Sequence, residues 1–148
     1  MSRVNDDREA IRYLMATYNI NGDRGRVEAL GATFLDDATI EFSGEATTGR
    51  AAIVARLSNG GARNPALTVS RHHITTSLIE VDGDTATART YFQVLTDVGL
   101  DHHGHYLDSL TRRGGTWFFA HRNVRIDYQA PTSLYGPFQL RRRADAAP

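Results

Sequence analysis

The first part of the chain carries apolar side chains at helical spacing. Residues 5–21 follow the i, i+3, i+4, i+7 rule after polar residues suited to capping a helix, and the apolar stripe consists of Ile11, Leu14, Met15 and Tyr18. We expect this helix to end near Gly22, which leaves Asp23 just past it. A short helix, a strand and another short helix are then predicted at about 26–34, 38–42 and 49–57.

The second part of the chain predicts strands alone. The first is 70–81, which is rich in β-branched residues and ends at the turn Asp82-Gly83-Asp84. Alternating patterns predict three more, at 85–97, 103–112 and 116–128, with Gly114-Gly115 as a hairpin turn. Polar loops are expected at 43–48 and 59–65.

Helices followed by long antiparallel strands predict an α+β fold. We expect a cone-shaped, strongly curved antiparallel (mixed) sheet that wraps around the three N-terminal helices and encloses a pocket. Residues 1–130 are predicted to form a single domain. Residues 131–148 are predicted to be an irregular tail that is partly disordered.

Composition narrows the chemistry. The 148-residue chain has 17 acidic and 17 basic residues, which argues against nucleic-acid and membrane partners. All of the basic residues are arginine, and cysteine is absent, so lysine Schiff bases, thiol nucleophiles and disulfides are excluded. No apolar run suggests a signal peptide or a membrane span, so we expect a soluble, cytoplasmic protein.

Two adjacent histidines stand on the first long strand. His72 and His73 must point to opposite faces of the sheet, so only one of them can line a cavity. An imidazole is a good proton acceptor at neutral pH, and a carboxylate at its other nitrogen fixes its orientation. Asp23 is the candidate carboxylate. The alternative is a histidine satisfied within the core and an Asp23 that only caps a turn.

Further polar side chains share a sheet face with apolar residues. Arg122 lies among apolar neighbours on the last strand, where it needs an anion such as Asp23, Asp108 or a ligand. Tyr106 and Asp108 share a face of the preceding strand, so Tyr106 is a candidate pocket hydroxyl and Asp108 a second acid or the partner of Arg122. Tyr18 either packs in the core or places a hydroxyl near a substrate oxygen.

A cluster of histidines at residues 102, 103 and 105 raises the question of a metal site. His103 and His105 share a strand face, but the cluster follows a loop, and a solvated polar turn is the favoured interpretation. No metal-binding or nucleotide-binding sequence motif is found. We therefore predict no metal and no cofactor.

The order helix, helix, strand, short helix and four long strands resembles the nuclear transport factor 2-like fold, and within it the SnoaL-like group. The resemblance covers about residues 5–130 and is carried by Tyr18…Asp23 together with the segments 34–40, 48–53, 82–86 and 114–122. This superfamily includes scytalone dehydratase, a bile-acid dehydratase and a dehydrochlorinase. In such members a strand histidine acts as a base that an aspartate orients.

By this resemblance His73 and Asp23 match the base and its partner, and His72 is expected to face away from the pocket. Tyr18 and Arg122 match pocket positions. The resemblance also implies a homodimer. It does not identify the reaction, because this fold hosts many chemistries.

We therefore predict a cofactor-independent lyase or isomerase that acts on a small, apolar, cyclic molecule by dehydration, isomerisation or cyclisation. His73 would remove a proton from carbon, Asp23 would orient it, and Tyr18 or Tyr106 would assist at an oxygen. Arg122 would anchor the ligand or hold Asp23. Two alternatives stay open: a non-catalytic ligand-binding or assembly protein, and a hydrolase in which the pair activates water.

Overall fold

The computed structural model describes residues 3–58 and 64–140. Its elements are α1 (Arg3–Asp23), α2 (Val27–Gly31), β1 (Phe34–Phe42), β2 (Glu45–Thr48), α3 (Arg50–Ser58), β3 (Ser70–Asp82), β4 (Thr85–Thr96), β5 (Gly99–Arg113) and β6 (Thr116–Gln129). The predicted α+β class is confirmed. The predicted loop at 43–48 contains the short strand β2, and both β1 and β5 begin four residues earlier than expected.

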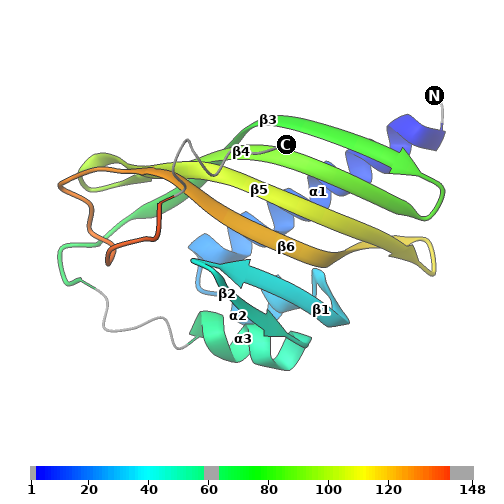
Figure 1. Ribbon diagram of the computed structural model, residues 1–148, viewed down its shortest axis with the longest axis horizontal. Coiled ribbons are helices and arrows are strands. Elements are labelled where there is room, and N and C mark those ends of the chain that lie inside the picture. Colours follow the sequence, from blue (N-terminus) through cyan, green and yellow to red (C-terminus); the bar gives the residue numbers. More distant parts are fainter. Residues whose placement is uncertain (1–2, 59–63, 141–148) are drawn as a thin grey trace.

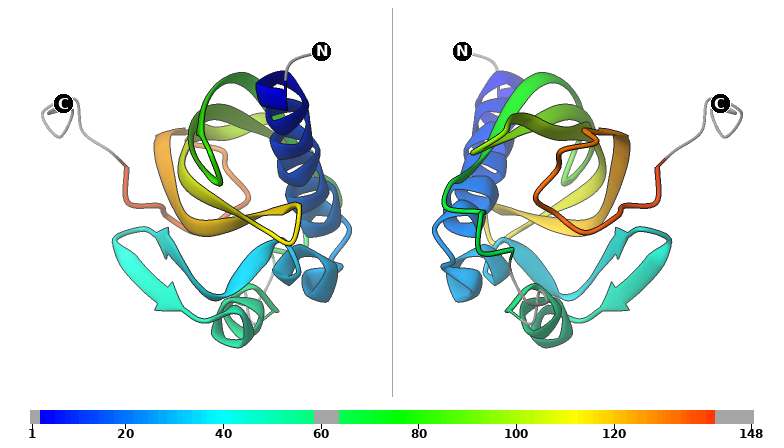
Figure 2. Two further views of the ribbon diagram at one scale, coloured as in Figure 1. Left: turned by 90° about the vertical axis from the view of Figure 1, so that its right-hand side faces the viewer. Right: turned by 90° about the vertical axis from the view of Figure 1, so that its left-hand side faces the viewer.

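One mixed sheet forms the body of the described chain. Its strand order is β2-β1-β6-β5-β4-β3, in which β1 and β6 run parallel and all other neighbours run antiparallel. The long strands β3 to β6 run side by side, with α1 behind them and the smaller elements below (Figure 1). Seen from either end, the sheet curls strongly without closing, and α1 lies along its open side (Figure 2).

The apolar stripe of α1 is buried against the sheet. Ile11 and Met15 are almost inaccessible to solvent, and Tyr18 packs edge-on against Phe34 and Phe119. At the other end of the helix, Asp7 accepts hydrogen bonds from the indole of Trp117 and the guanidinium of Arg112. These contacts fix α1 at both ends, because an amphipathic helix is stabilised mainly by the face it buries.

The tail predicted after residue 130 is only partly as expected. Residues 131–140 are irregular, but Tyr135 and Phe138 pack against the core, and Leu140 forms a parallel bridge with Ile126 of β6. The loop residues 59–63 and the tail residues 141–148 lie outside the described residues.

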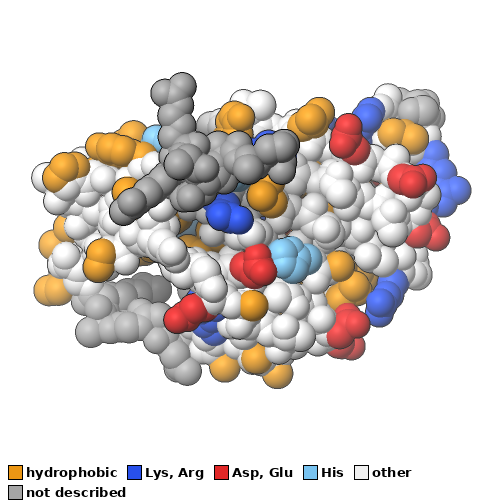
Figure 3. Space-filling view, viewed as in Figure 1, with side chains coloured by type: hydrophobic (Ala, Val, Ile, Leu, Met, Phe, Trp, Pro, Cys, Tyr) orange, Lys and Arg blue, Asp and Glu red, His pale blue; other side chains and the backbone are white. Residues whose placement is uncertain are grey.

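Acidic and basic side chains are interspersed on the face shown in Figure 3, in keeping with the net charge of zero. Within residues 3–58 and 64–140, no helix has the length and apolar character needed to cross a membrane.

A buried ion pair lies in the middle of the fold. Arg122 of β6 donates two hydrogen bonds of 2.8 Å, from Nε and Nη2, to the two carboxylate oxygens of Asp108 on β5. Both side chains are completely inaccessible to solvent. The guanidinium also stacks on aromatic rings, with its central carbon 3.9 Å from the ring centre of Tyr106, 4.0 Å from Phe119 and 4.3 Å from Tyr18.

We predict that Asp108→Asn lowers the free energy of unfolding by about 3–5 kcal/mol, because it leaves the Arg122 charge buried without its anion. Replacing both partners, as in Asp108→Leu with Arg122→Met, should cost much less than the single change. Urea denaturation of the three proteins measures this, with exposed Asp37→Asn as the control. A single variant as stable as the control would contradict the assigned role.

Candidate functional site

A cavity of about 420 Å³ opens between the inner face of the curved sheet, the end of α1 and the C-terminal segment. Its walls are mainly aromatic and aliphatic, which suits a small apolar ligand. The polar or titratable side chains that line it are Tyr18, Arg56, His72, His102, Tyr106 and Tyr135.

Asp23 and His72 form a carboxylate–imidazole pair at this cavity. Asp23 Oδ1 lies 2.6 Å from Nδ1 of the imidazole, and Asp23 Oδ2 accepts a hydrogen bond of 2.9 Å from the backbone N–H of His72. The Asp23 side chain is 5% exposed and the His72 side chain 28%. The last residue of α1 is thus bonded to a residue near the start of β3. Because Asp23 occupies Nδ1 of His72, Nε2 is the ring nitrogen left for a ligand.

His73 was predicted to be the partner of Asp23, but the partner is the preceding residue, His72. Strand alternation does place the two histidines on opposite faces, but it is His72 that faces inward and His73 that is exposed. Alternation cannot decide which of two adjacent residues faces inward, because a shift of one residue reverses every side chain. In this structure the inward residue is the one whose backbone N–H and imidazole both bond to Asp23.

Tyr18 and Tyr106 both line the cavity. Burial raises the pKa of both hydroxyls, so each stays protonated at neutral pH. The Tyr106 hydroxyl donates to Oδ1 of Asn19 on α1, at 3.2 Å. Tyr18 is therefore the tyrosine whose proton is better placed for a ligand oxygen.

Arg122 and Asp108 were candidates for binding the substrate, with an ion pair between them as the alternative, and the structure shows the ion pair away from the cavity. Neither side chain lines the cavity, because the two bond to each other beneath the rings of Tyr18 and Tyr106. Burial opposes the charge of Arg122, but Asp108 outweighs it and raises the pKa of Arg122 above its ordinary value. The pair therefore supports the rings of Tyr18 and Tyr106, which form the floor of the cavity. Arg122 bonds to Asp108 and does not hold Asp23.

His102 is a cavity residue that the sequence analysis missed. It was assigned to a solvated turn, but β5 begins at Gly99, so His102 lies inside the strand and is 3% exposed. Its Nδ1 lies 2.7 Å from Oδ1 of Asp101, whose side chain is fully buried. The signal that could have identified it is parity, since His102 shares the even-numbered face with Tyr106 and Asp108.

The C-terminal segment covers one side of the cavity. Its rings Tyr135 and Phe138 contact His102, and the Tyr135 hydroxyl lies 2.8 Å from that of Ser70. Asp101 anchors this segment, because its carboxylate accepts hydrogen bonds from the Ser133 hydroxyl and the Leu134 backbone N–H.

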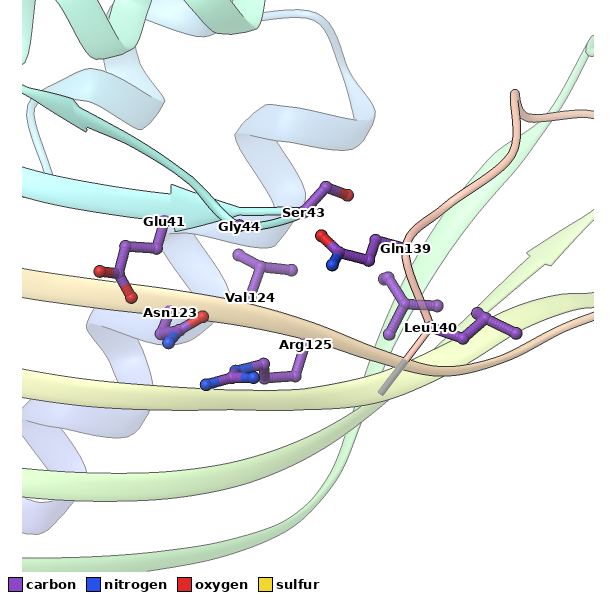
Figure 4. A pocket seen from close by; sticks show the side chains of 9 residues that line it. Glu41, Ser43, Gly44, Asn123, Val124, Arg125, Gln139 and Leu140 are labelled. Atoms are coloured by element: carbon purple, nitrogen blue, oxygen red, sulfur yellow. The ribbon is translucent and has the colours of Figure 1, made fainter. Parts of the chain in front are cut away.

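A second depression, of about 370 Å³, lies where the β1–β2 hairpin diverges from β6. Figure 4 shows Glu41, Asn123 and Arg125 toward one end of it and Gln139 with Leu140 toward the other. It is more polar than the main cavity, and the residues described along it include no carboxylate–imidazole pair. Among the described residues, no group of three or more histidine or acidic side chains could hold a metal ion.

The chain matches known structures and a known family. A family model described as a SnoaL-like domain matches residues 3–123. No curated protein matches in sequence. A Mycobacterium tuberculosis protein of unknown function, solved as a single-residue variant, is 30% identical; the match covers 86% of this chain and 77% of that one, with a TM-score of 0.74.

Two structures from Novosphingobium aromaticivorans are also similar. One is described as a nuclear transport factor 2-like protein with a cystatin-like fold; it is 29% identical over 88% of each chain, with a TM-score of 0.76. The other is a candidate scytalone dehydratase that is 22% identical over 87% of this chain and 92% of that one, with a TM-score of 0.70, which shows the shared fold alone. By the family match over most of its length and by its fold, the chain belongs to the SnoaL-like family.

Proposed function

We propose that this protein is a cofactor-independent lyase or isomerase whose base is His72. In the proposed step, Nε2 of His72 takes a proton from a carbon next to a carbonyl group of a small cyclic ligand. The C–H electron pair moves to the carbonyl oxygen as an enolate. In a dehydration, the enolate expels a hydroxyl group from the adjacent carbon, and this group leaves as water with the proton that His72 took. In a cyclisation, the enolate carbon attacks a second carbonyl carbon of the ligand, whose oxygen takes that proton. In an isomerisation, His72 returns the proton to another carbon of the conjugated enolate.

The observation that carries the proposal is the contact between Asp23 and His72 at an apolar cavity. A buried carboxylate at Nδ1 favours the tautomer that leaves the Nε2 lone pair for the ligand. It also stabilises the imidazolium that forms when the proton is taken. No residue other than His72 among those described combines a cavity position with a bond to Asp23.

Tyr18 is proposed to stabilise the developing enolate. Its hydroxyl keeps its proton at neutral pH, because burial raises its pKa, and it lies in the same cavity. A neutral donor aimed at an oxygen that gains charge is the general means of lowering such a barrier. Tyr106 is less suited, since it donates to Asn19.

The comparisons support this class of reaction over a purely structural role. The family assignment and the similarity to a candidate scytalone dehydratase suggest a dehydratase or cyclase. The apolar lining and the volume of the cavity are consistent with a small cyclic substrate.

We predict that His72→Asn reduces proton abstraction by about 100- to 10,000-fold, because a positioned general base contributes that much. The assay is turnover, or deuterium incorporation from heavy water, across a panel of hydroxylated cyclic ketones. His73→Asn is the matched control, because this neighbouring histidine is exposed on the other face. Equal losses in the two variants, or none in His72→Asn, would show that the cavity only binds its ligand or that the base lies elsewhere.

Asp23 and His72 are expected to act as one unit. Asp23→Asn should reduce turnover by about 100- to 10,000-fold, because it disturbs the tautomer and the imidazolium. The double variant Asp23→Asn with His72→Asn should be no slower than His72→Asn alone, since residues of one unit are not additive. Exposed Asp37→Asn serves as the control. Multiplicative losses in the double variant would mean that the two residues act independently.

We predict that Tyr18→Phe lowers kcat by about 100- to 1,000-fold, as expected for the loss of one donor to a developing oxyanion. KM should change little, because the ring and its contacts with Phe34 and Phe119 are retained. Tyr13→Phe, at an exposed position on the same helix, is the control. A change confined to KM would assign Tyr18 to packing around the ligand.

A further inference from the structure

A second carboxylate–imidazole pair places its histidine, His102, in the wall of the same cavity, and the proposed reaction does not use it. His102 and Asp101 are joined at 2.7 Å, with side chains only 4% and 0% exposed. The pair is more deeply buried than Asp23 and His72. Burying such a pair is costly unless its groups are satisfied. Asp101 is satisfied by His102, the Ser133 hydroxyl and the Leu134 backbone N–H, which leaves Nε2 of His102 as the atom of the pair that a ligand could meet.

The two imidazoles face the cavity from the same level of the sheet. His72 on β3 pairs in register with Val94 on β4, which pairs with His102 on β5. The ring of Phe92 lies between them, with its centre 6.3 Å from that of His72 and 6.5 Å from that of His102. One face of the Phe92 ring stacks on Tyr106, with ring centres 4.5 Å apart. A flat ligand in the cavity against the remaining surface of Phe92 would lie beside both histidines.

The strand pairing is irregular around His102, which alternation along β5 places on the inner face with Tyr106. Register shifts flank it, between Val94 and Leu95 on β4 and between His103 and Gly104 across the β5–β6 pair. Gly104 cannot carry a side chain, because a Cβ there would lie 1.8 Å from the carbonyl oxygen of Arg125. His103 faces the other way and stacks on Tyr128, with ring centres 5.3 Å apart.

Asp101 determines which ring nitrogen meets the ligand. Burial opposes its charge, but hydrogen bonds from Ser133, His102 and the Leu134 backbone outweigh burial and lower the pKa of Asp101. Its carboxylate accepts the Nδ1 proton of His102, which leaves the lone pair on Nε2. Burial is also the largest cause that lowers the pKa of His102, so the ring is neutral at neutral pH. At neutral pH, Nε2 of His102 therefore accepts a hydrogen bond from a ligand and does not donate a proton to it.

We propose that Nε2 of His102 is a subsite that accepts a hydrogen bond from a ring hydroxyl of the substrate, while His72 faces the carbon that loses its proton. The inference rests on the proposed function, because it assigns both histidines to one ligand. The substrate class is accordingly a planar, hydroxylated ring compound whose hydroxyl lies across the ring system from its acidic C–H.

The test compares 2-naphthol with 2-methoxynaphthalene, its methyl ether, which has no proton to donate. The wild-type protein should bind 2-naphthol about 3- to 10-fold more tightly, the preference that one neutral hydrogen bond supplies. His102→Phe keeps a ring among Phe92, Tyr135 and Phe138, and should reduce the preference to about one. His103→Phe, the outward neighbour, should retain it.

A second measurement does not depend on a variant. With nitrogen-15 in the histidine rings, 2-naphthol should shift the Nε2 resonance of His102 in the wild-type protein, and the methyl ether should not. Equal binding of the two compounds by the wild type, an unchanged preference in His102→Phe, or an unmoved Nε2 resonance would each overturn the inference.

The same binding assay separates this inference from the proposed function. His72→Asn should keep the preference for 2-naphthol, since the base is not needed to recognise a hydroxyl. If His102 confers the preference but no cyclic ketone is deprotonated, the reaction proposed for His72 fails and the hydroxyl subsite stands. If deprotonation needs His72 but the preference is absent, the inference fails alone.

Discussion

The buried charge of Arg122 is the constraint around which the interior is arranged. A guanidinium removed from water must be matched by an anion, and Asp108 on the neighbouring strand matches it with two hydrogen bonds. The rings of Tyr18, Tyr106 and Phe119 then cover its faces. Because Tyr18 belongs to α1 and the others to β5 and β6, this cluster fixes the helix against the sheet and forms the floor of the cavity.

That floor separates two kinds of polar group. Arg122 and Asp108 lie below it and stabilise the fold, whereas His72 and His102 lie above it and face the cavity. Asp23 and Asp101 perform the same task for the two histidines, since each fixes an Nδ1 and leaves an Nε2 for the ligand. Each also ties down backbone: Asp23 holds the start of β3, and Asp101 holds the segment that carries Tyr135.

The sequence predicted the architecture well, because hydrophobic periodicity and turn residues are local signals. The stripe of Ile11, Met15 and Tyr18 specified the face that α1 buries. The site was predicted less well, because it depends on relations between distant segments. Choosing between His72 and His73 required the contact with Asp23, and recognising His102 required knowing that β5 begins at Gly99. Arg122 was correctly expected to need an anion, but only the structure selects Asp108.

The proposed reaction requires the acidic carbon of the ligand to lie against Nε2 of His72. The decisive measurement is a crystal structure of the protein with a cyclic ketone that it deprotonates. We expect the ketone to rest on Phe92, with its acidic carbon about 3–3.5 Å from Nε2 of His72, the separation of reacting atoms poised for proton transfer. A ketone bound outside this cavity, or one whose acidic carbon faces away from the imidazole, would contradict the account.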